Sequence, residues 1–246
     1  MTSKAVVAEL DEALDRMLQS DEPLGERLIA YADVLRQINR PFAEAVDRLV
    51  ARLDAIGAGT SAPNIGEAMP SFLLPDETGR LFTLEDFLGR GPVIVAFRRG
   101  HWCPYCLLAT EDLEQVQSVI SARGGSVIVI TPDREQFAKE LKKRSRASFP
   151  ILSDIDNGYA LSIGIAIAVG EEMRDFMSRR GRDLATYQGN SSWMLPIPAT
   201  FLLDANGILV MRHVDGDYRK RPASGDLIAA IEALPLSARS QTSPQP

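Results

Sequence analysis

The 246-residue sequence contains only two cysteines, Cys103 and Cys106, which are three positions apart. Residues three apart on a helix lie on the same side, so this spacing allows an intramolecular disulfide. At a helix N-terminus, unpaired backbone N–H groups and the helix dipole favour a thiolate over a thiol. The pair therefore predicts redox chemistry, with Cys103 as the thiolate and Cys106 facing it.

A close cysteine pair has two other interpretations. A structural zinc site needs about four ligands. The chain adds only His101 and His213 as nitrogen ligands, without the usual paired spacing, so we expect no metal. Two inert, buried cysteines fit poorly with a position beside Trp102 at a strand-to-helix turn. The Gly89–Gly91 turn lacks the lysine and the glycine spacing of a phosphate loop, so no cofactor is expected.

Strands and helices must position the pair. The apolar run 92–97 predicts a buried strand directly before the cysteines, and a helix with apolar spacing follows them until Gly124. The continuous apolar run 126–131 predicts a second buried strand, paired in parallel and covered by helices on both faces. Further expected elements are a hairpin over 72–84, a helix from 132 to 146, a strand over 149–154, a helix over 159–163, a hairpin turning at 204–207, and a helix over 224–234. For 165–190 we expect one helix over 171–180 and a loop through Gly189.

The first sixty residues have a different pattern. Apolar residues recur at steps of three and four, which predicts amphipathic helices, and Gly57 ends the last of them. These helices serve either as a docking or dimerisation arm or as a layer that covers part of the core, and we prefer the layer slightly. The predicted division is an N-terminal helical extension (1–60), one domain (61–236) and a disordered tail (237–246).

Composition narrows the possible partners. The formal net charge of −6 argues against nucleic acid or an anionic membrane surface. No apolar run approaches the length of a membrane span, and acidic residues appear too early for a secretory signal. A cytoplasmic location is therefore expected. In that reducing compartment a close cysteine pair is more typical of catalysis or redox sensing than of a structural disulfide.

The order of elements resembles the thioredoxin fold, an α/β fold with a central mixed sheet and helices on both faces. Trp102–Cys106 (Trp-Cys-Pro-Tyr-Cys) is similar to the thioredoxin Trp-Cys-x-x-Cys motif, with the Pro-Tyr pair of glutaredoxins. The segment Ile197–Phe201 resembles the strand whose cis-proline faces the cysteines in that fold. The resemblance implies that Pro198 is cis and contributes to substrate binding with Trp102.

A longer stretch of the sequence narrows the resemblance to one family. Residues 66–76, the turn at Gly79, residues 82–84 and the strand ending at Gly100 resemble the peroxiredoxin-like branch of the alkyl hydroperoxide reductase and thiol-specific antioxidant family. The resemblance covers about residues 61–234. It implies a thiol-dependent peroxidase that reduces hydrogen peroxide or organic hydroperoxides and is recycled by a thioredoxin-like dithiol.

The resemblance also implies roles for individual residues. Cys103 becomes the nucleophile that is oxidised to sulfenic acid, and Cys106 resolves it as a disulfide. The leaving oxygen needs positive or hydrogen-bonding groups nearby. His101, Arg98 and Arg99 are close in sequence, and Arg219 or Arg221 can return from the segment before the last helix. His101 either tunes the thiolate or hydrogen-bonds the turn.

The sequence departs from the family in one respect. Typical peroxiredoxins have a proline seven residues and a threonine three residues before the nucleophile, where this chain has Ala96 and Gly100. The usual peroxide pocket is therefore incomplete. This departure keeps two alternatives open, a thiol-disulfide oxidoreductase and a non-catalytic redox sensor whose helical arm binds a partner. A homodimer through the N-terminal helices also stays open.

Overall fold

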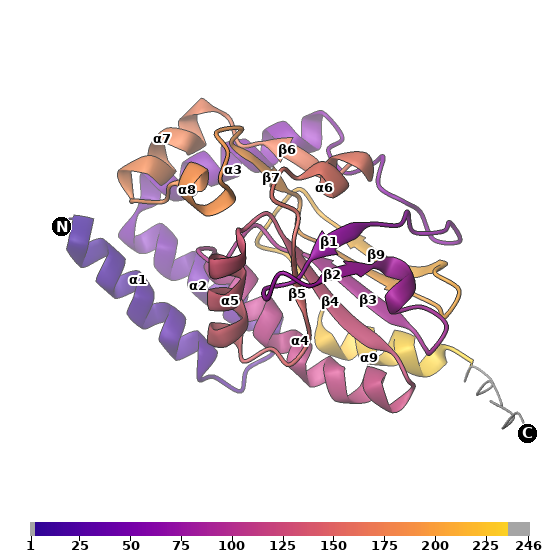
Figure 1. Ribbon diagram of the computed structural model, residues 1–246. Helices are drawn as coiled ribbons and strands as arrows, with labels where there is room; N and C mark the ends of the chain where they lie inside the picture. Colours follow the sequence, from indigo (N-terminus) through magenta and orange to yellow (C-terminus); the bar gives the residue numbers. More distant parts are fainter. Residues whose placement is uncertain (1–2, 236–246) are drawn as a thin grey trace, which may run out of the picture.

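The structure is a computed structural model that describes residues 3–235 (Figure 1). Its central sheet has the strand order β5–β4–β3–β8–β9. These strands are β3 (Val93–Phe97), β4 (Ser126–Thr131), β5 (Ile151–Ser153), β8 (Ala199–Leu203) and β9 (Leu209–Val214). β3, β4 and β5 are parallel, whereas β8 is antiparallel to both β3 and β9. This mixed sheet confirms the predicted thioredoxin-like fold, including the parallel pairing of the two apolar runs.

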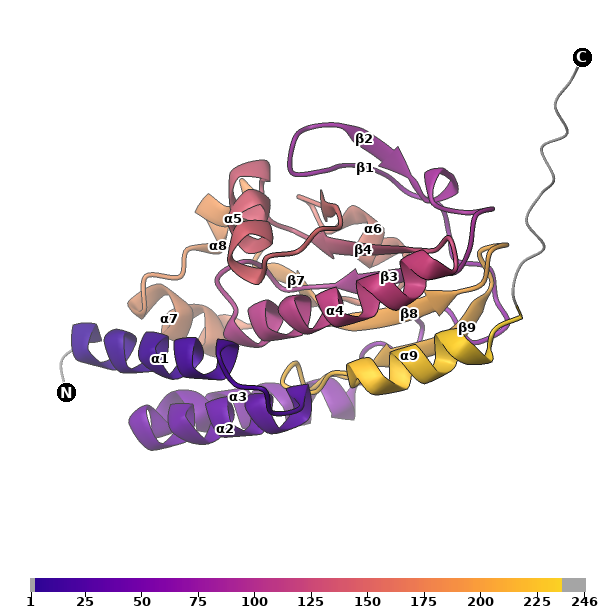
Figure 2. The same ribbon diagram turned by 90° about the horizontal axis from the view of Figure 1, so that it is seen from below.

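The two faces of the sheet are buried by different elements. Along β3, Ile94 and Ala96 join the cluster that contains helix α4 (Pro104–Ala122) and helix α9 (Ser224–Ala233). The alternate residues belong to a second cluster with α6 (Gly158–Ser162). Figure 2 shows α4 and α9 along one face and the β1–β2 hairpin on the other. Because successive strand residues point to opposite faces, a strand buried on both sides must be apolar throughout.

The hairpin predicted over 72–84 is present. β1 (Leu73–Pro75) pairs antiparallel with β2 (Leu81–Thr83), and the 3-10 helix η1 (Leu84–Asp86) follows. Thr83 and Asp86 form a reciprocal capping pair at its start. Helix α5 (Glu135–Ser145) follows β4, as predicted.

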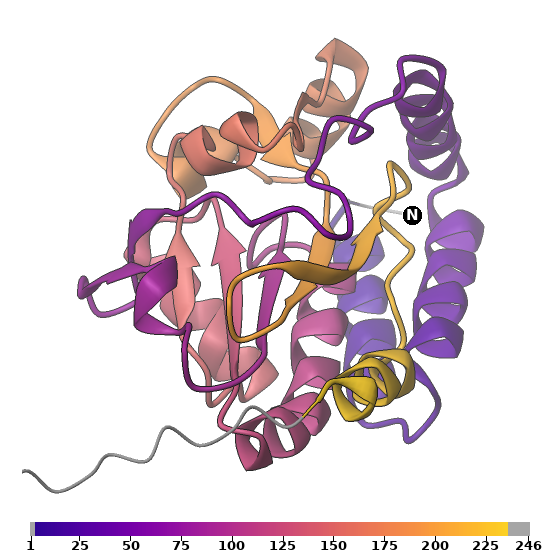
Figure 3. The same cartoon turned by 90° about the vertical axis from the view of Figure 1, so that its right-hand side faces the viewer.

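The N-terminal residues form three helices, as the apolar spacing predicted. They are α1 (Ser3–Leu18), α2 (Leu24–Ile38) and α3 (Arg40–Ala55). Figure 3 shows them gathered on one side of the sheet, beside α4 and α9. Arg27 of α2 is buried and bonds to Glu111 at 2.9 Å and to Asp112 at 3.0 Å, both on α4. In this chain α1 and α2 therefore form a layer over α4, and α3 packs against α2.

The segment between β5 and β8 differs from the prediction. The expected helix is present as α7 (Glu171–Arg179), but the expected loop contains a second helix, α8 (Leu184–Gln188). Two short strands, β6 (Ala166–Ala168) and β7 (Met194–Pro196), pair antiparallel around these helices. Three residues are too few to show a strand period, which explains why both strands were missed.

Two predictions concern the chain ends and membranes. The tail predicted to be disordered lies outside the described residues. Within residues 3–235, every helix is too short or too polar to cross a lipid bilayer.

Candidate active site

The loop between β3 and α4 places both cysteines at one end of the sheet. Cys103 is the residue that precedes α4, and its carbonyl accepts hydrogen bonds from the backbone N–H groups of Cys106 and Leu107, each at 3.0 Å. Pro104 occupies the first helical position, where a missing N–H costs nothing. The two cysteines are thus one helical turn apart, as the sequence predicted.

Gly100 determines the shape of this loop. Its φ is +143°, a conformation that favours glycine, and a Cβ atom there would lie 2.4 Å from Nε1 of Trp102. A threonine at this position, as in typical peroxiredoxins, would collide with the indole. The departure from the peroxiredoxin pattern is therefore part of the loop geometry.

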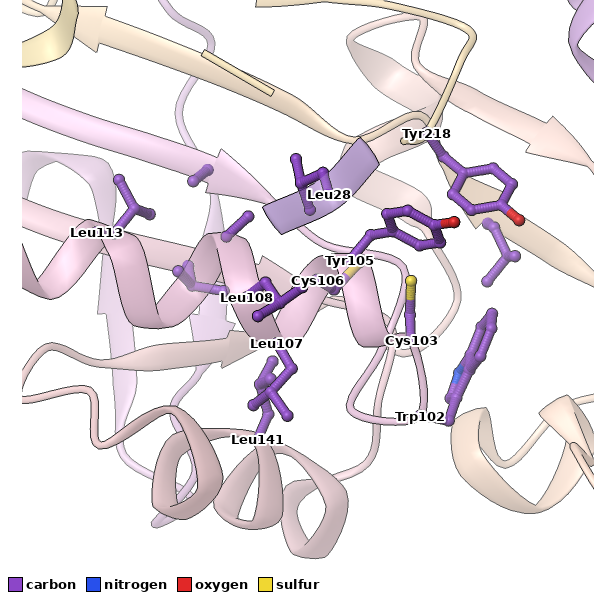
Figure 4. Close-up of a cluster of buried hydrophobic side chains, with 14 of the residues drawn as sticks. Leu28, Trp102, Cys103, Tyr105, Cys106, Leu107, Leu108, Leu113, Leu141 and Tyr218 are labelled. Atoms are coloured by element: carbon purple, nitrogen blue, oxygen red, sulfur yellow. The ribbon is translucent and has the colours of Figure 1, made fainter. Parts of the chain in front are cut away.

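Both thiols are free and buried, and their side chains are hydrogen-bonded to each other. Figure 4 shows the Cys103 side chain between Tyr105 and Trp102, with Tyr218 beyond Tyr105. Cys103 lines a pocket. Cys106 is 0% exposed and lies behind Cys103, away from the pocket. A substrate in the pocket therefore meets the sulfur of Cys103 first.

Three arginines surround the pair. The backbone N–H of Arg99 donates to Sγ of Cys106 at 3.3 Å, and Nη2 of Arg221 donates to the same sulfur at 3.8 Å. Arg98 is 1% exposed, and within residues 3–235 its guanidinium bonds to Thr110 and to the carbonyls of Phe97 and Ala109. None of the three forms an ion pair with a carboxylate in residues 3–235. A buried cation without a carboxylate favours a nearby anion, and the thiolate is the group available.

Neighbouring groups shift the pKa of both thiols. At Cys106 burial alone would raise the pKa, but the hydrogen bond with Cys103 and the charges of Arg221, Arg98 and Arg99 outweigh burial and lower it. At Cys103 burial, the hydrogen bond with Cys106 and its charge raise the pKa of the thiol. These directions favour ionisation at Cys106, whereas the sequence predicted the thiolate at Cys103.

Of the two arginines before α9, only Arg221 reaches the site. Arg219 bonds to Asp217 at 2.8 Å and to Asp47 of α3 at 2.8 Å. Its charge is therefore neutralised away from the sulfurs. Arg98, Arg99 and Arg221 are brought together from the three predicted positions, although 122 residues separate the first and the last in the chain.

His101 is held on the other side of the loop. Its backbone N–H donates to Asp133 at 2.6 Å, its Nδ1 lies 3.3 Å from the same carboxylate, and its ring stacks on Phe137. His101 does not line the pocket that Cys103 faces. These contacts fix the turn, which is one of the two roles left open by the sequence.

The predicted cis peptide at Pro198 was wrong, because the described residues contain no cis peptide bond. The chain runs extended from β7 into β8, and Ile197 N–H donates to the carbonyl of Ile165 at 2.7 Å. This pairing directs the segment toward β6. Pro198 does not line the pocket beside Cys103, whereas Trp102 does.

Aromatic residues far apart in the sequence complete the site. Tyr105 packs edge-on against Tyr31 of α2 and against Tyr218, each with ring centroids 5.4 Å apart. The Arg99 guanidinium lies 3.8 Å from the ring centroid of Tyr218. Sequence reasoning missed Tyr31 and Tyr218. The only sequence signal for Tyr218 is that it directly precedes the two candidate arginines.

The described residues contain no group of three or more His, Cys, Asp or Glu side chains placed to hold a metal ion. The side chains around the sulfurs are instead guanidinium groups and aromatic rings.

Comparisons with known proteins agree with this geometry. The sequence pattern of the AhpC/TSA family matches residues 65–212. A chloroplastic putative peroxiredoxin Q from Oryza sativa subsp. indica is 35% identical over 169 residues, which are 69% of this chain and 67% of that protein. Peroxiredoxin Bcp from Escherichia coli K12 is 27% identical over 154 residues, which are 63% of this chain and 86% of that protein.

Solved structures show the same fold. Peroxidoxin BcpB from Mycobacterium tuberculosis aligns with a TM-score of 0.53 at 19% identity, over 70% of this chain and 97% of that chain. Peroxiredoxin Q from Xanthomonas campestris aligns with a TM-score of 0.52 at 17% identity, over 71% of this chain and 98% of that chain. In each comparison close to a third of this chain stays unmatched.

A thioredoxin-like fold that carries two free thiols at a helix N-terminus, beside unpaired arginines, defines a thiol-dependent oxidoreductase. The family match and the peroxiredoxin relatives make it a thiol peroxidase. The chain belongs to the AhpC/TSA family, which confirms the resemblance found in the sequence.

Proposed function

We propose that the protein reduces hydrogen peroxide and organic hydroperoxides at Cys103 and that Cys106 resolves the oxidised intermediate. The observation that carries this proposal is the position of the two sulfurs. Cys103 lines the pocket, and Cys106 lies one turn behind it with two arginine contacts to its sulfur. The sulfur of Cys103 can thus contact a peroxide in the pocket, and the arginines favour ionisation of Cys106.

In the first step the sulfur of Cys103 attacks the terminal oxygen of the hydroperoxide. An S–O bond forms and the O–O bond breaks, so that sulfur is oxidised and the peroxide is reduced. The proton of the Cys103 thiol passes to the Cys106 thiolate along their hydrogen bond. The products are Cys103 sulfenic acid, the Cys106 thiol, and an alkoxide that takes a proton from solvent.

The second step forms the disulfide. Cys106 attacks the Cys103 sulfenic acid, an S–S bond replaces the S–O bond, and water leaves. The arginines that lower the pKa of Cys106 favour its ionisation for this attack. A dithiol then exchanges with the disulfide, becomes oxidised itself, and restores both thiols.

Arg99 is the group we assign to the leaving oxygen. It lines the pocket together with Cys103, and it has no carboxylate partner in the part of the chain that the structure describes. Negative charge grows on the leaving oxygen as the O–O bond breaks, and a buried cation stabilises that charge more than water does.

Thiol-disulfide exchange is the second candidate function. The observation in its favour is the Gly100 loop, which excludes the threonine that orients peroxide in typical peroxiredoxins. The Cys-x-x-Cys pair at a helix N-terminus is equally suited to exchange with a protein or glutathione disulfide. A redox sensor without turnover is the third.

Mass spectrometry after one equivalent of peroxide tests the proposal. We expect loss of two hydrogens and a peptide that links Cys103 to Cys106, with sulfenic acid on Cys103 when Cys106 is replaced by serine. Stopped-flow oxidation by peroxide is then compared with reduction of insulin disulfides. Faster insulin reduction than peroxide oxidation favours exchange, and negligible turnover in both assays favours the sensor.

We further propose a thioredoxin-like protein as the reductant, a cytoplasmic location, and the division into a helical extension (1–60) and a thioredoxin-like domain (61–236). A close cysteine pair that cycles through a disulfide suits a reducing compartment, where a dithiol can restore both thiols. A homodimer through the N-terminal helices stays part of the proposal, supported by Ile29 of α2, which is 64% exposed. Sedimentation of the reduced and oxidised protein measures the assembly state.

A further inference from the structure

The pocket in front of Cys103 combines segments inside the family match with the N-terminal helices, which lie outside it. Its apolar wall comes from the N-terminal helices and from α7, and its members are Val7, Leu10, Tyr31, Leu35, Met173 and Met177. All but Val7 are buried. Hydrogen peroxide needs no such wall, whereas an alkyl chain is stabilised by burial against it.

The same pocket is positively charged in a chain of net charge −6. Three arginines line it, Arg99 beside Cys103 and Arg180 and Arg182 after α7, whereas Asp11 is its only acidic lining residue. Asp11 is exposed on α1, so water screens its charge. An anionic ligand group is therefore favoured over a neutral one.

Arg180 and Arg182 are available for such a group. Neither forms an ion pair or a side-chain hydrogen bond with any residue between 3 and 235, and Nε of Arg180 is buried without a partner. The Arg180 guanidinium is held by the ring of Phe42, whose centroid lies 4.8 Å away. Two half-buried arginines can bind a carboxylate through charge-assisted hydrogen bonds.

Tyr31 lines the same pocket as the two arginines and the reacting sulfur. Burial raises the pKa of its hydroxyl, and the charges of Arg180, Arg182 and Cys103 all act on it. A ligand in this pocket can therefore contact Cys103 and the two arginines at once.

We infer that this pocket recognises an organic hydroperoxide that also carries a carboxylate, with the carboxylate at Arg180 and Arg182 and the peroxide at Cys103. The inference rests on the proposed peroxidase function, since the reacting group has to be a peroxide. Arg180 and Arg182 act on binding and take no part in breaking the O–O bond.

The test compares ω-hydroperoxydecanoate with its methyl ester, which has the same chain and peroxide but no charge. We expect kcat/KM of the full chain to be about tenfold higher for the acid, the size of one charge-assisted contact. The double variant Arg180→Gln/Arg182→Gln should lose this preference. The matched control Arg174→Gln/Arg179→Gln removes the same amount of charge from α7, outside the pocket, and should keep the preference.

Equal rates for the acid and the ester in the unmodified chain would overturn the inference. It would also be overturned if Arg174→Gln/Arg179→Gln lost the preference for the acid as fully as Arg180→Gln/Arg182→Gln. Calorimetric titration of the Cys103→Ser variant with decanoate separates this result from failure of the peroxidase proposal. Decanoate binding that the Arg180/Arg182 double variant abolishes supports the recognition site even if peroxide turnover is absent. No binding, with peroxide turnover intact, rejects the site alone.

Discussion

Nη2 of Arg221 lies 3.8 Å from Sγ of Cys106, although 115 positions separate the two residues in the chain. The contact closes a group of three arginines around a sulfur that is fully buried. Removing these charges would leave the desolvation penalty of the thiolate uncompensated. The acidity of the cysteine pair therefore depends on a segment that comes after the last strand of the sheet.

Replacing Arg221 tests this dependence. The Arg221→Met variant should raise the pKa of the Cys106 thiol from about 5, because one lost charge near a buried thiolate costs about 1.4 kcal/mol. Oxidation by peroxide should therefore slow about fivefold at pH 5 and change little at pH 7. Stopped-flow tryptophan fluorescence gives the rate. Lys220→Met removes a neighbouring charge that is bonded to Asp215, and it should leave the rate unchanged. An equal loss of oxidation rate in Arg221→Met and Lys220→Met would instead indicate a general effect of the protein's charge and contradict the role of Arg221.

The two cysteines should respond differently to replacement. Cys103→Ser should abolish peroxide turnover, because serine cannot form the sulfenic acid. Cys106→Ser should allow one round of oxidation and then stop, since no thiol is left in the chain to resolve the intermediate. Single-turnover and steady-state assays distinguish the two results. Equal residual activity in both variants would contradict the assigned roles.

The rate of oxidation should depend on pH in an unusual way. An ordinary thiol has a pKa of about 8.5, so its reaction with peroxide speeds up between pH 7 and pH 9. The pKa of Cys106 is lowered to about 5, and a thiol with a lowered pKa loses its charge only when the pH falls through that value. Single-turnover rates should therefore stay level from pH 8 to pH 6 and fall below that. A steady rise above pH 7 would refute the assignment.

The ion pair between α2 and α4 should contribute strongly to stability. Arg27→Met leaves the carboxylate of Asp112 buried without its cation, which costs about 3 kcal/mol of unfolding free energy in urea. The exposed pair Arg36–Asp47 provides the control, since Arg36→Met should cost less than about 1 kcal/mol. Adding Asp112→Asn to Arg27→Met should recover part of the loss. Equal costs for the two arginine variants would contradict the burial argument.

Much of the fold was predictable because its signals are local. The continuous apolar runs fixed β3 and β4, and the turn at Asp204–Gly207 fixed the β8–β9 hairpin. A proline directly after Cys103 marked the start of α4. Each of these features is decided by neighbours within a few residues, so tertiary contacts did not override it.

The rest depended on contacts between distant segments. The pairing of β6 with β7 leads the chain past Pro198 without the predicted cis bond. The position of the negative charge on Cys106 requires Arg221, whose approach no local pattern shows. Similarly, apolar spacing identified α2 but could not show that α2 packs against α4. That packing places Tyr31 against Tyr105.

The position of Arg221 after the last strand of the sheet has a consequence for biosynthesis. A ribosome makes the Cys-x-x-Cys segment more than a hundred residues before the cation that contacts its inner sulfur. Until then the nascent chain carries two thiols of ordinary acidity, which oxidants attack slowly. The enzyme thus gains its reactivity only after Arg221 has been made and has packed against the sulfur, and a nascent chain that still lacks it is spared from oxidation.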